Sequence, residues 1–318
     1  MSLAVHVATL GRGPGRSRAL TRAEASDAMA AMLSGKAAPE AIGALLMLLR
    51  MKGETAEEIA GLAEAAQAPL GALPAVALDW PSYAAGRTRG LPWFLLSARL
   101  VAAAGYPVLL HGRNGTSAAV RDHLGAAGIP AASTLADLSR ALDRQGIAYA
   151  GLEHLHPGLS QLLNLRPVLG LRSCINTVCR MLNPARAAAS VQGVFHPSYR
   201  PLQSEAAYIM GWSALSVIKG GGGEFECHPG KDIRCFGLRE GRRFDHTRGA
   251  SAATGIRRLS EVAPDVDLAG LWSGRVEDPF AREIVISTAA LALETLGAAA
   301  PEARARALWE TRQDQLAA

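Results

Sequence analysis

The sequence predicts an α/β protein with a small amino-terminal helical domain and a larger α/β domain that contains a mostly parallel central sheet. Apolar residues recur at helical spacing in the first 70 residues, whereas short apolar runs alternate with helical stretches from about residue 75. A length of 318 residues is enough for two packed units of ordinary size. We therefore expect domains over residues 1–74 and 75–318.

Capping signals define the helices of the first domain. Thr21 and Thr55 are each followed three residues later by a glutamate, which is the spacing of a capping box at a helix start. Pro39 suits the first turn of a helix that begins between them. The expected helices cover residues 23–33, 39–49 and 55–67.

Short apolar runs that follow helical segments predict the buried strands of the second domain. A different pattern occurs near residue 240, where Glu240 and Gly241 form a turn signal between two extended runs, so we expect a basic hairpin over 231–244. Pro301 separates two closing helices. The expected strands are 108–110, 147–149, 191–194 and 215–218, and the expected helices are 91–104, 279–297 and 302–316.

The composition excludes several classes of protein. With 49% hydrophobic and 19% charged residues, the chain is an ordinary globular one. No stretch reaches the ~20 uninterrupted apolar residues of a membrane-spanning helix, and the amino terminus lacks a secretion signal. We therefore expect a cytoplasmic protein without membrane contact. The four cysteines lack the spacing of a zinc or redox motif, so we expect reduced structural thiols rather than a metal site with His228.

Positive charge is segregated along the sequence. Residues 1–22, 80–121 and 231–258 carry net charges of +4, +5 and +5, although the whole chain carries only +5. The rest of the chain is therefore acidic. Such segregation is expected if one face binds a polyanion, and it predicts a continuous positive groove. The alternative is that the three segments lie apart in space.

Three motifs follow one another in the middle of the chain. Residues 166–176 read RPVLGLRSCIN, residues 182–186 read LNPAR, and residues 191–197 read VQGVFHP. His111-Gly112 and His156-Pro157 lie upstream in the matching order. Together with the helical pattern of residues 21–67, these motifs resemble the anthranilate phosphoribosyltransferase family, glycosyltransferase family 3, over about residues 20–300.

The resemblance implies a donor site from which this chain departs. The family holds the diphosphate of phosphoribosyl diphosphate in a glycine-rich loop of backbone N–H groups, but residues 79–90 read DWPSYAAGRTRG and cannot form that nest. Leu110 stands where the family has a phosphate-contacting lysine. Of the family's adjacent Asp-Glu pair, which suits magnesium, only Glu226 is matched. We therefore expect no cofactor; the alternative is magnesium with phosphoribosyl diphosphate.

Part of the family's acceptor site is retained. The resemblance associates Arg166 with an aromatic acceptor, and Asn176 and His156 are also present. Either Arg166, Asn176 and His156 line a residual small-molecule pocket, or Arg166 and Asn176 hold the two domains together through hydrogen bonds, because buried polar groups must be paired. The candidate pocket residues are His111, Gly112, Asn114, His156, Arg166 and Asn176.

The sequence favours nucleic-acid binding without sequence preference, and predicts no catalytic residue. A divergent branch of the family shares the Gly-Arg-Gly start, here residues 11–13, lacks the diphosphate loop and binds nucleic acid. We expect DNA or RNA as the partner, bound through phosphate contacts, and a homodimer formed by the helical domain. The alternative is a phosphoribosyl or glycosyl transferase with an altered donor site. The expected phosphate contacts are Arg87, Arg89, Arg113, Arg121, Lys231, Arg234, Arg239, Arg242, Arg243, Arg248, Arg257 and Arg258.

Overall fold

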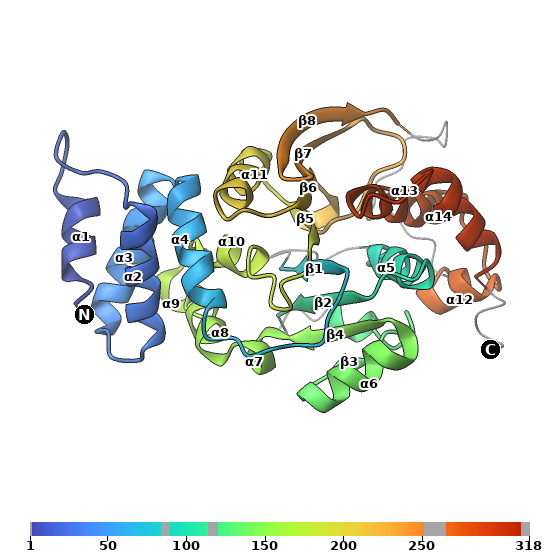
Figure 1. Cartoon of the computed structure of the whole chain (residues 1–318), viewed down its shortest axis with the longest axis horizontal. Coiled ribbons are helices and arrows are strands. Elements are labelled where there is room, and N and C mark those ends of the chain that lie inside the picture. The colour runs from blue at the N-terminus through green and yellow to red at the C-terminus, as the bar shows by residue number, and fades with distance from the viewer. Residues whose placement is uncertain (1, 84–89, 114–119, 251–264, 313–318) are drawn as a thin grey trace.

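The computed structural model describes residues 2–83, 90–113, 120–250 and 265–312. A helical domain lies at one end of the molecule and a larger α/β domain occupies the rest (Figure 1). The predicted fold class is confirmed. The exact boundary between residues 74 and 75 stays a prediction.

Both predicted capping boxes form in the helical domain. The Thr21 and Thr55 side chains accept the backbone N–H groups of Glu24 and Glu58, whose carboxylates bond back to the cap residues. The first helix, α1, was not predicted, because it has no side-chain cap and therefore no start signal. It is held by tertiary contacts instead, including a 2.8 Å contact from His6 to Asp27. The helices are α1 (Ala4–Gly11), α2 (Arg22–Leu33), α3 (Pro39–Lys52) and α4 (Ala56–Gln67).

The α/β domain is built on an eight-stranded sheet with the order β3-β4-β2-β1-β5-β6-β7-β8. The first six strands in this order are parallel, and the β7–β8 hairpin adds two antiparallel strands at one edge. The strands are β1 (Leu78–Ser82), β2 (Val108–Gly112), β3 (Ala131–Ala132), β4 (Ile147–Gly151), β5 (Ala189–Val194), β6 (Ala214–Lys219), β7 (Ile233–Arg239) and β8 (Arg242–Arg248).

Two of these strands were not predicted. Strand β3 has only two residues, too few for an apolar pattern. Strand β1 lies in the middle of the sheet although it contains Pro81, a residue that is rare in central strands because it cannot donate a ladder hydrogen bond. Tertiary packing overrides this signal, since Trp80 in the same strand stacks on Phe94 and meets the edge of Phe225.

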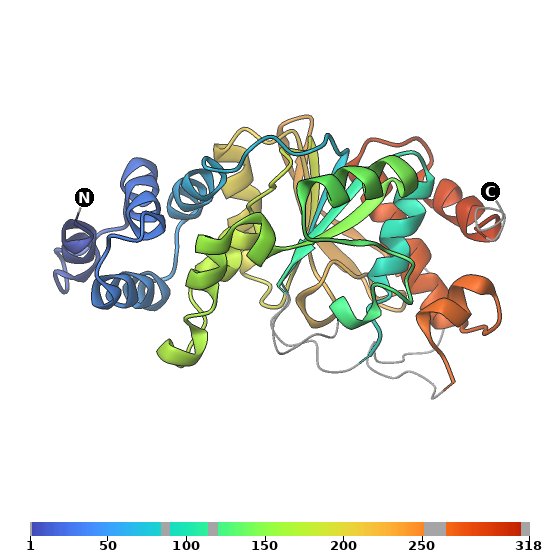
Figure 2. The same cartoon turned by 90° about the horizontal axis from the view of Figure 1, so that it is seen from below.

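Helices cover both faces of the sheet (Figure 2). One face packs on α5 and α13, and the other packs on α6 at one side and on α10 and α11 at the other. The helical domain joins this second face through α4, which packs on α10 and α11. The remaining elements are α5 (Phe94–Ala103), η1 (Arg121–His123), α6 (Leu135–Gln145), α7 (Leu152–Leu155), α8 (Pro157–Leu163), α9 (Arg166–Leu169), α10 (Ile175–Arg180), α11 (Tyr199–Ile209), η2 (Gly221–Gly223), α12 (Leu268–Ser273), α13 (Pro279–Thr295) and α14 (Pro301–Glu310).

None of the helices in the described ranges has the length and apolar character that crossing a membrane requires.

Candidate functional site

A pocket of about 300 Å³ lies where the helical domain meets the carboxyl ends of the central strands. Its wall includes Arg50 from α3, Arg166, Arg172 and Arg180 from the α9–α10 region, and residues that follow β5. A smaller adjoining cavity shares Arg166 and Arg172 and adds Arg113, which follows β2. We call the two cavities together the arginine pocket. In open α/β sheets, ligands bind at this edge of the sheet.

The local backbone explains how a short sequence places several arginines together. Helix α9 ends at Gly170, whose φ of 68° lets the chain turn back so that Arg172 faces the same cavity as Arg166. Asn176 and Arg180 lie one turn apart on α10, and the Asn176 side-chain oxygen accepts a hydrogen bond from Arg180. Arg50 donates to the Arg172 carbonyl at 2.6 Å, which joins the two domains across the pocket.

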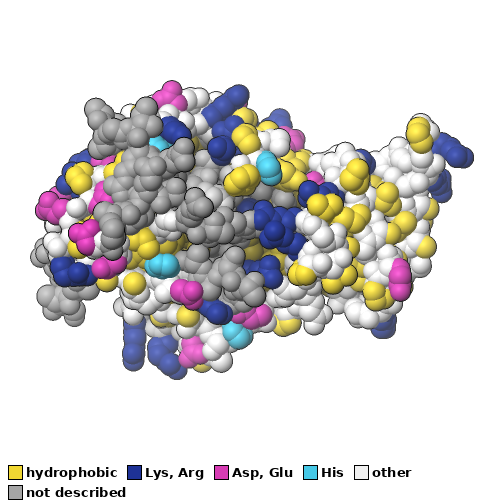
Figure 3. All heavy atoms as spheres, turned by 180° about the vertical axis from the view of Figure 1, so that it is seen from behind, with side chains coloured by type: hydrophobic (Ala, Val, Ile, Leu, Met, Phe, Trp, Pro, Cys, Tyr) yellow, Lys and Arg dark blue, Asp and Glu magenta, His cyan; other side chains and the backbone are white. Residues whose placement is uncertain are grey.

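The arginine pocket is short of negative charge. Burial lowers the pKa of Arg172, and the positive charges of Arg166, Arg180 and Arg50 lower it further. Burial also lowers the pKa of Arg180, against a favourable effect of Glu224. None of the five pocket arginines forms an ion pair with a carboxylate within the described ranges. Figure 3 shows Lys and Arg side chains gathered on this face, beside the helical domain.

Of the predicted pocket residues that the structure describes, two line this site and three do not. Arg166 and Asn176 line both cavities, as the residual-pocket hypothesis expects. His156 instead caps α8: its Nδ1 accepts the Leu159 N–H at 3.2 Å, and its Nε2 lies 3.0 Å from the Ala66 carbonyl. This second contact reaches α4 of the helical domain. Asn114 lies outside the described residues.

His111 belongs to a buried polar chain beneath the pocket. Its Nε2 lies 3.0 Å from the Asp79 carboxylate and its Nδ1 lies 2.8 Å from the Tyr83 hydroxyl. Ser190 donates to the same carboxylate at 2.8 Å. His111 is 0% exposed, so its ring is not available to a ligand. Gly112 next to it is required by close packing, because a β-carbon there would lie 2.5 Å from the Ser82 carbonyl oxygen.

Tyr83 lies directly after β1, at the place where the resemblance locates the family's diphosphate loop. Its carbonyl accepts hydrogen bonds from Arg180 at 3.0 Å and from Asn176 at 3.3 Å. Its hydroxyl is bonded to His111, and burial raises its pKa well above the ordinary value. The Tyr83 side chain is therefore buried in the protein rather than open to a ligand.

The carboxylates near β6 do not fit a magnesium ion. Glu224 is 2% exposed and accepts the Ser82 hydroxyl at 2.9 Å, whereas Glu226 is 1% exposed and accepts the Phe94 N–H at 3.1 Å. Magnesium usually keeps several waters, which these interior positions do not admit. Across the described ranges, no group of three His, Cys, Asp or Glu side chains could hold a metal.

The glycines around these carboxylates allow close packing of the backbone, which explains them without a bound phosphate. A β-carbon at Gly193 would lie 2.0 Å from the Glu224 carbonyl carbon, and one at Gly220 would lie 1.7 Å from the Glu224 carbonyl oxygen. Both positions therefore need glycine so that the chain can bring Glu224 against β5. This requirement accounts for part of the glycine run at residues 220–223 without a bound phosphate.

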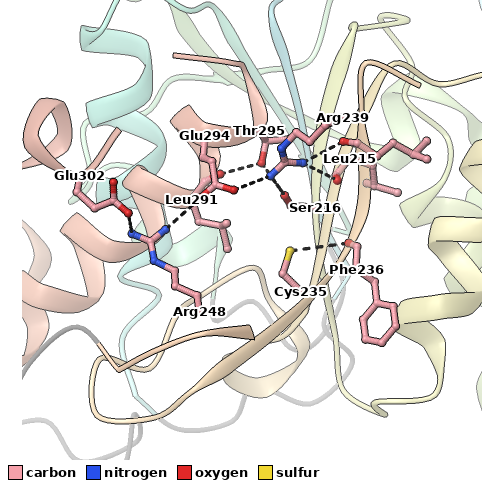
Figure 4. Close-up of polar contacts among 11 residues, drawn as sticks. Leu215, Ser216, Cys235, Phe236, Arg239, Arg248, Leu291, Glu294, Thr295 and Glu302 are labelled. Atoms are coloured by element: carbon pink, nitrogen blue, oxygen red, sulfur yellow. Dashed lines mark hydrogen bonds and ion pairs between the residues drawn. The ribbon is translucent and has the colours of Figure 1, made fainter. Parts of the chain in front are cut away.

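The basic hairpin predicted over 231–244 exists, but many of its arginines are paired with acids. Arg239 on β7 donates to Glu294 on α13, to Ser216 and to the Leu215 carbonyl (Figure 4). Arg248 on β8 pairs with Glu294 and Glu302. In the same hairpin, Arg234 pairs with Asp245 and Arg243 pairs with Glu205.

The other predicted phosphate contacts are dispersed. Arg113 lines the arginine pocket, while Arg121, Lys231 and Arg242 are exposed. The positions that lie outside the described residues are Arg87, Arg89, Arg257 and Arg258.

The first basic segment lies in and beside the helical domain at one end of the molecule, apart from the hairpin, which lies over the α/β domain (Figure 1). There, Arg18 pairs with Glu24 and Arg22 pairs with Glu64. The described parts of the three basic segments therefore do not form one groove, and that prediction is wrong. The physical reason is that acids from other segments neutralise charges that look unbalanced along the sequence.

Comparisons with known proteins identify the family. The helical bundle domain of a glycosyl transferase family matches residues 7–68, and the α/β domain of the same family matches residues 94–246. An anthranilate phosphoribosyltransferase from Anaeromyxobacter sp. is 31% identical over 296 residues, which cover 88% of this chain and 86% of that protein. The chain belongs to this glycosyl transferase family. A relative of the same name from Rhodospirillum rubrum is 31% identical and covers 89% of the chain and 84% of its own length.

Solved structures of the family have the same fold. The anthranilate phosphoribosyltransferase from Thermus thermophilus matches with a TM-score of 0.77 at 24% identity and covers 98% of this chain and 96% of its own. The enzyme from Saccharomyces cerevisiae in complex with PRPP and Mg matches with a TM-score of 0.78 at 17% identity, over 98% and 93% of the two chains. At these identities the likeness concerns the fold alone.

These relatives overturn the predicted function. They are named as phosphoribosyltransferases, so the prediction of a nucleic-acid-binding protein with DNA or RNA as its partner is wrong, and membership of a nucleic-acid-binding branch is not shown. The departure of residues 79–90 from the family's loop sequence does not exclude a transferase, because the arginine pocket is present at the carboxyl edge of the sheet.

The lining residues that the sequence analysis missed include three arginines and a glutamine. Arg172 stood inside a recognised motif, and Arg180 lies just beyond it, so their closeness to Arg166 was a usable signal. Arg50 comes from the other domain, and nothing local links it to this site. Gln203 on α11 has no motif at all, and it is identified only by its burial in the pocket wall.

Proposed function

We propose that this chain is a phosphoribosyl or glycosyl transferase with an altered donor site, acting on an anionic aromatic acceptor. The observation that carries the proposal is the arginine pocket at the carboxyl edge of the sheet in a chain of this family. Phosphoribosyl diphosphate and anthranilate are the first substrates to test, because the relatives' name contains both groups.

The reaction is a substitution at the anomeric carbon of the sugar. A bond forms between that carbon and the amine nitrogen of the acceptor, while the bond to the diphosphate oxygen breaks. The diphosphate leaves with the electron pair, and the amine loses one proton to solvent. Such catalysis depends on positioning and on stabilising the charge of the leaving group.

The pocket residues support this chemistry through charge and orientation. Arg166 and Asn176 face the cavity and suit the acid group of a substrate. Arg180 and Asn176 also hold the Tyr83 carbonyl, which keeps the end of β1 in place beside the cavity. Because His111 is buried against Asp79, we assign it to positioning β1 and β2 rather than to proton transfer.

The cytoplasm is the location that we propose for this activity. All four cysteines are free, buried thiols, and burial raises the pKa of Cys227 to about 12 and of Cys235 to about 11. Free thiols of this kind suit a reducing compartment.

The direct test is turnover. The protein is mixed with phosphoribosyl diphosphate and anthranilate, and the loss of anthranilate fluorescence and the release of pyrophosphate are followed together. We expect both signals, and we expect Arg166→Gln to lower kcat/KM by about tenfold or more, since a lost charge-assisted contact is worth at least that factor. Arg144→Gln is the control, because Arg144 is exposed at the end of α6, away from the pocket.

Two results would contradict the proposal. One is an absence of pyrophosphate release with anthranilate and with a panel of other aromatic amines that carry a carboxylate, each measured with and without magnesium. The other is equal activity of wild type and Arg166→Gln.

A further inference from the structure

We propose that the acceptor of this chain is an aromatic amine with two acid groups, and that Arg50 binds the second of them. Arg166 and Asn176 hold the first acid group, which lies beside the amine. The inference rests on the proposed function and names the class of its acceptor. Anthranilate, which has a single carboxylate, then matches only part of the acceptor for which the pocket is built.

The walls of the arginine pocket carry positive charge and no acid. Four arginines line the main cavity and the smaller cavity adds a fifth, whereas no Asp or Glu is among the described residues that line either cavity. Burial lowers the pKa of Arg172, and the charges of Arg166, Arg180 and Arg50 lower it further. Like charges that converge in one cavity repel one another at short range, so the pocket favours a ligand with more than one negative charge.

The arginines are spread along the pocket rather than gathered at one point. Arg113 lines only the smaller cavity, Arg50 lines only the main cavity, and Arg166 and Arg172 line both. A carboxylate is a compact group that binds a guanidinium through two parallel hydrogen bonds. One carboxylate beside Arg166, where the two cavities adjoin, therefore leaves Arg50 in the main cavity without a negative partner.

Arg50 is better placed than Arg180 to bind the second acid group. Arg180 is only 7% exposed, and its guanidinium already donates to the Asn176 side-chain oxygen at 2.5 Å and to the Tyr83 carbonyl at 3.0 Å. Arg50 is exposed and gives one nitrogen to the Arg172 carbonyl at 2.6 Å. Its other N–H groups form no hydrogen bond within the described ranges, so they can donate to a ligand in the main cavity.

The size and lining of the main cavity agree with a substituted aromatic ring. Its volume is about 300 Å³, whereas a cavity of about 150 Å³ already holds one benzene molecule. Leu171, Val194 and Phe195 line the same cavity as the arginines. These apolar side chains suit the ring, and the additional space suits a second acid group on it.

The experiment is titration calorimetry of the full chain with matched ligands, without a donor. The ligands are anthranilate, 2-aminoterephthalate and 4-aminoisophthalate, together with the analogues of the two diacids that carry a carboxamide in place of the second carboxylate. The carboxamide keeps the size of the acid group but has no charge. We expect a diacid to bind about tenfold or more tightly than its carboxamide, as one charge-assisted contact predicts, and this preference should decrease in high salt.

Variants test whether the preference depends on Arg50. Arg50→Gln should raise the Kd of the diacid by about tenfold or more and that of its carboxamide much less, whereas Arg166→Gln should weaken the binding of every ligand. Arg50→Lys keeps the charge and should restore part of the preference. A purely structural role of Arg50, through its bond to the Arg172 carbonyl, predicts that Arg50→Gln weakens all ligands alike. Arg144→Gln is the control, because Arg144 is exposed at the end of α6.

Three outcomes would overturn the inference. These are equal affinity of each diacid and its carboxamide, an unchanged preference in Arg50→Gln, or displacement of the bound diacid by phosphoribosyl diphosphate, which would assign the arginines to the donor. The proposed function is tested separately by turnover. Equal kcat/KM values for anthranilate and both diacids would keep the proposed function and remove this inference, whereas a binding preference for a diacid without turnover of any acceptor would remove the proposed function and keep the two-acid site.

Discussion

The arginines of the β7–β8 hairpin and those of the arginine pocket are the same residue type in opposite electrostatic situations. In the hairpin, Arg239 and Arg248 converge on Glu294, and Arg248 also reaches Glu302 (Figure 4). In the pocket, Arg172 is surrounded by other arginines, and burial together with their charge lowers its pKa. The hairpin arginines stabilise the fold, whereas the pocket arginines are held against repulsion by the fold around them.

This difference shows that the net charge of a sequence segment does not by itself indicate a binding surface. The net charge of +5 over residues 231–258 suggested a binding surface, but its counter-charges come from α11, α13 and α14, far away in the sequence. Residues 166–180 are not one of the three predicted basic segments. Their arginines nevertheless lack acidic partners among the described residues. Unpaired charge in a cavity, rather than charge density along the chain, is the better indicator of a candidate ligand site.

The largest expected loss of stability comes from a substitution that disrupts the hydrogen-bond network of the hairpin. Arg239→Ala removes a guanidinium that donates to two backbone carbonyls, to Ser216 and to Glu294. We expect the free energy of unfolding in urea to fall by roughly 2–3 kcal/mol, because a hydrogen bond to a charged group contributes about 1.5–3 kcal/mol. The matched control is Arg242→Ala, at an exposed position in the same hairpin. Equal stability of the two variants would show that the network does not anchor β7–β8.

The dependence of stability on pH separates the arginines from the other charged groups. Arginines stay charged between pH 8 and pH 5, so a change in stability over this range must come from other groups. Burial lowers the pKa of His156, whose Nδ1 accepts the Leu159 N–H and must lose that bond when it is protonated. The unfolded chain binds this proton more readily than the folded one. Stability is therefore full above the unfolded pKa of about 6.5 and is lost as the pH falls through the folded pKa.

The measurement is the melting temperature of wild type and His156→Gln between pH 8 and pH 5. We expect the wild type to lose more stability than the variant on acidification. Parallel curves for the two proteins would exclude His156 as the source of the pH dependence.

A smaller effect is expected from the exposed ion pair of the hairpin. Arg234 pairs with Asp245 on the protein surface, where water and salt screen the interaction. Arg234→Ala should lower stability much less than Arg239→Ala, and the difference from wild type should shrink further in high salt. A loss as large as that of Arg239→Ala would mean that exposure does not distinguish the two arginines.

The smallest expected effect on stability is in the pocket. Arg172→Gln removes a cation that other arginines repel, while its carbonyl still accepts the hydrogen bond from Arg50. We expect the free energy of unfolding to change by less than about 0.5 kcal/mol or to rise, in line with substitutions that break no favourable contact. A marked loss of stability in urea would show that Arg172 has a structural role that its contacts do not reveal.

Local signals were sufficient for most of the fold. Thr21 and Thr55 start helices through capping boxes, which involve only neighbouring residues, and the apolar runs of β2, β4, β5 and β6 mark buried parallel strands. They were insufficient for α1, which has no cap, and for β1, where Pro81 argues against a central strand. Both elements are held by contacts with distant residues.

The residues of the candidate site also fall into a group that the sequence could predict and a group that it could not. Arg166 and Asn176 could be predicted because they stand in a motif that resembles the family to which the chain belongs. Arg50 and Gln203 could not, because they enter the pocket from α3 and α11 without any local pattern. The sequence by itself thus determined the fold class, six of the helices, most of the strands, and the family. Only the tertiary structure decided which arginines are neutralised, because Coulomb interactions depend on distances in space and not on separation along the chain.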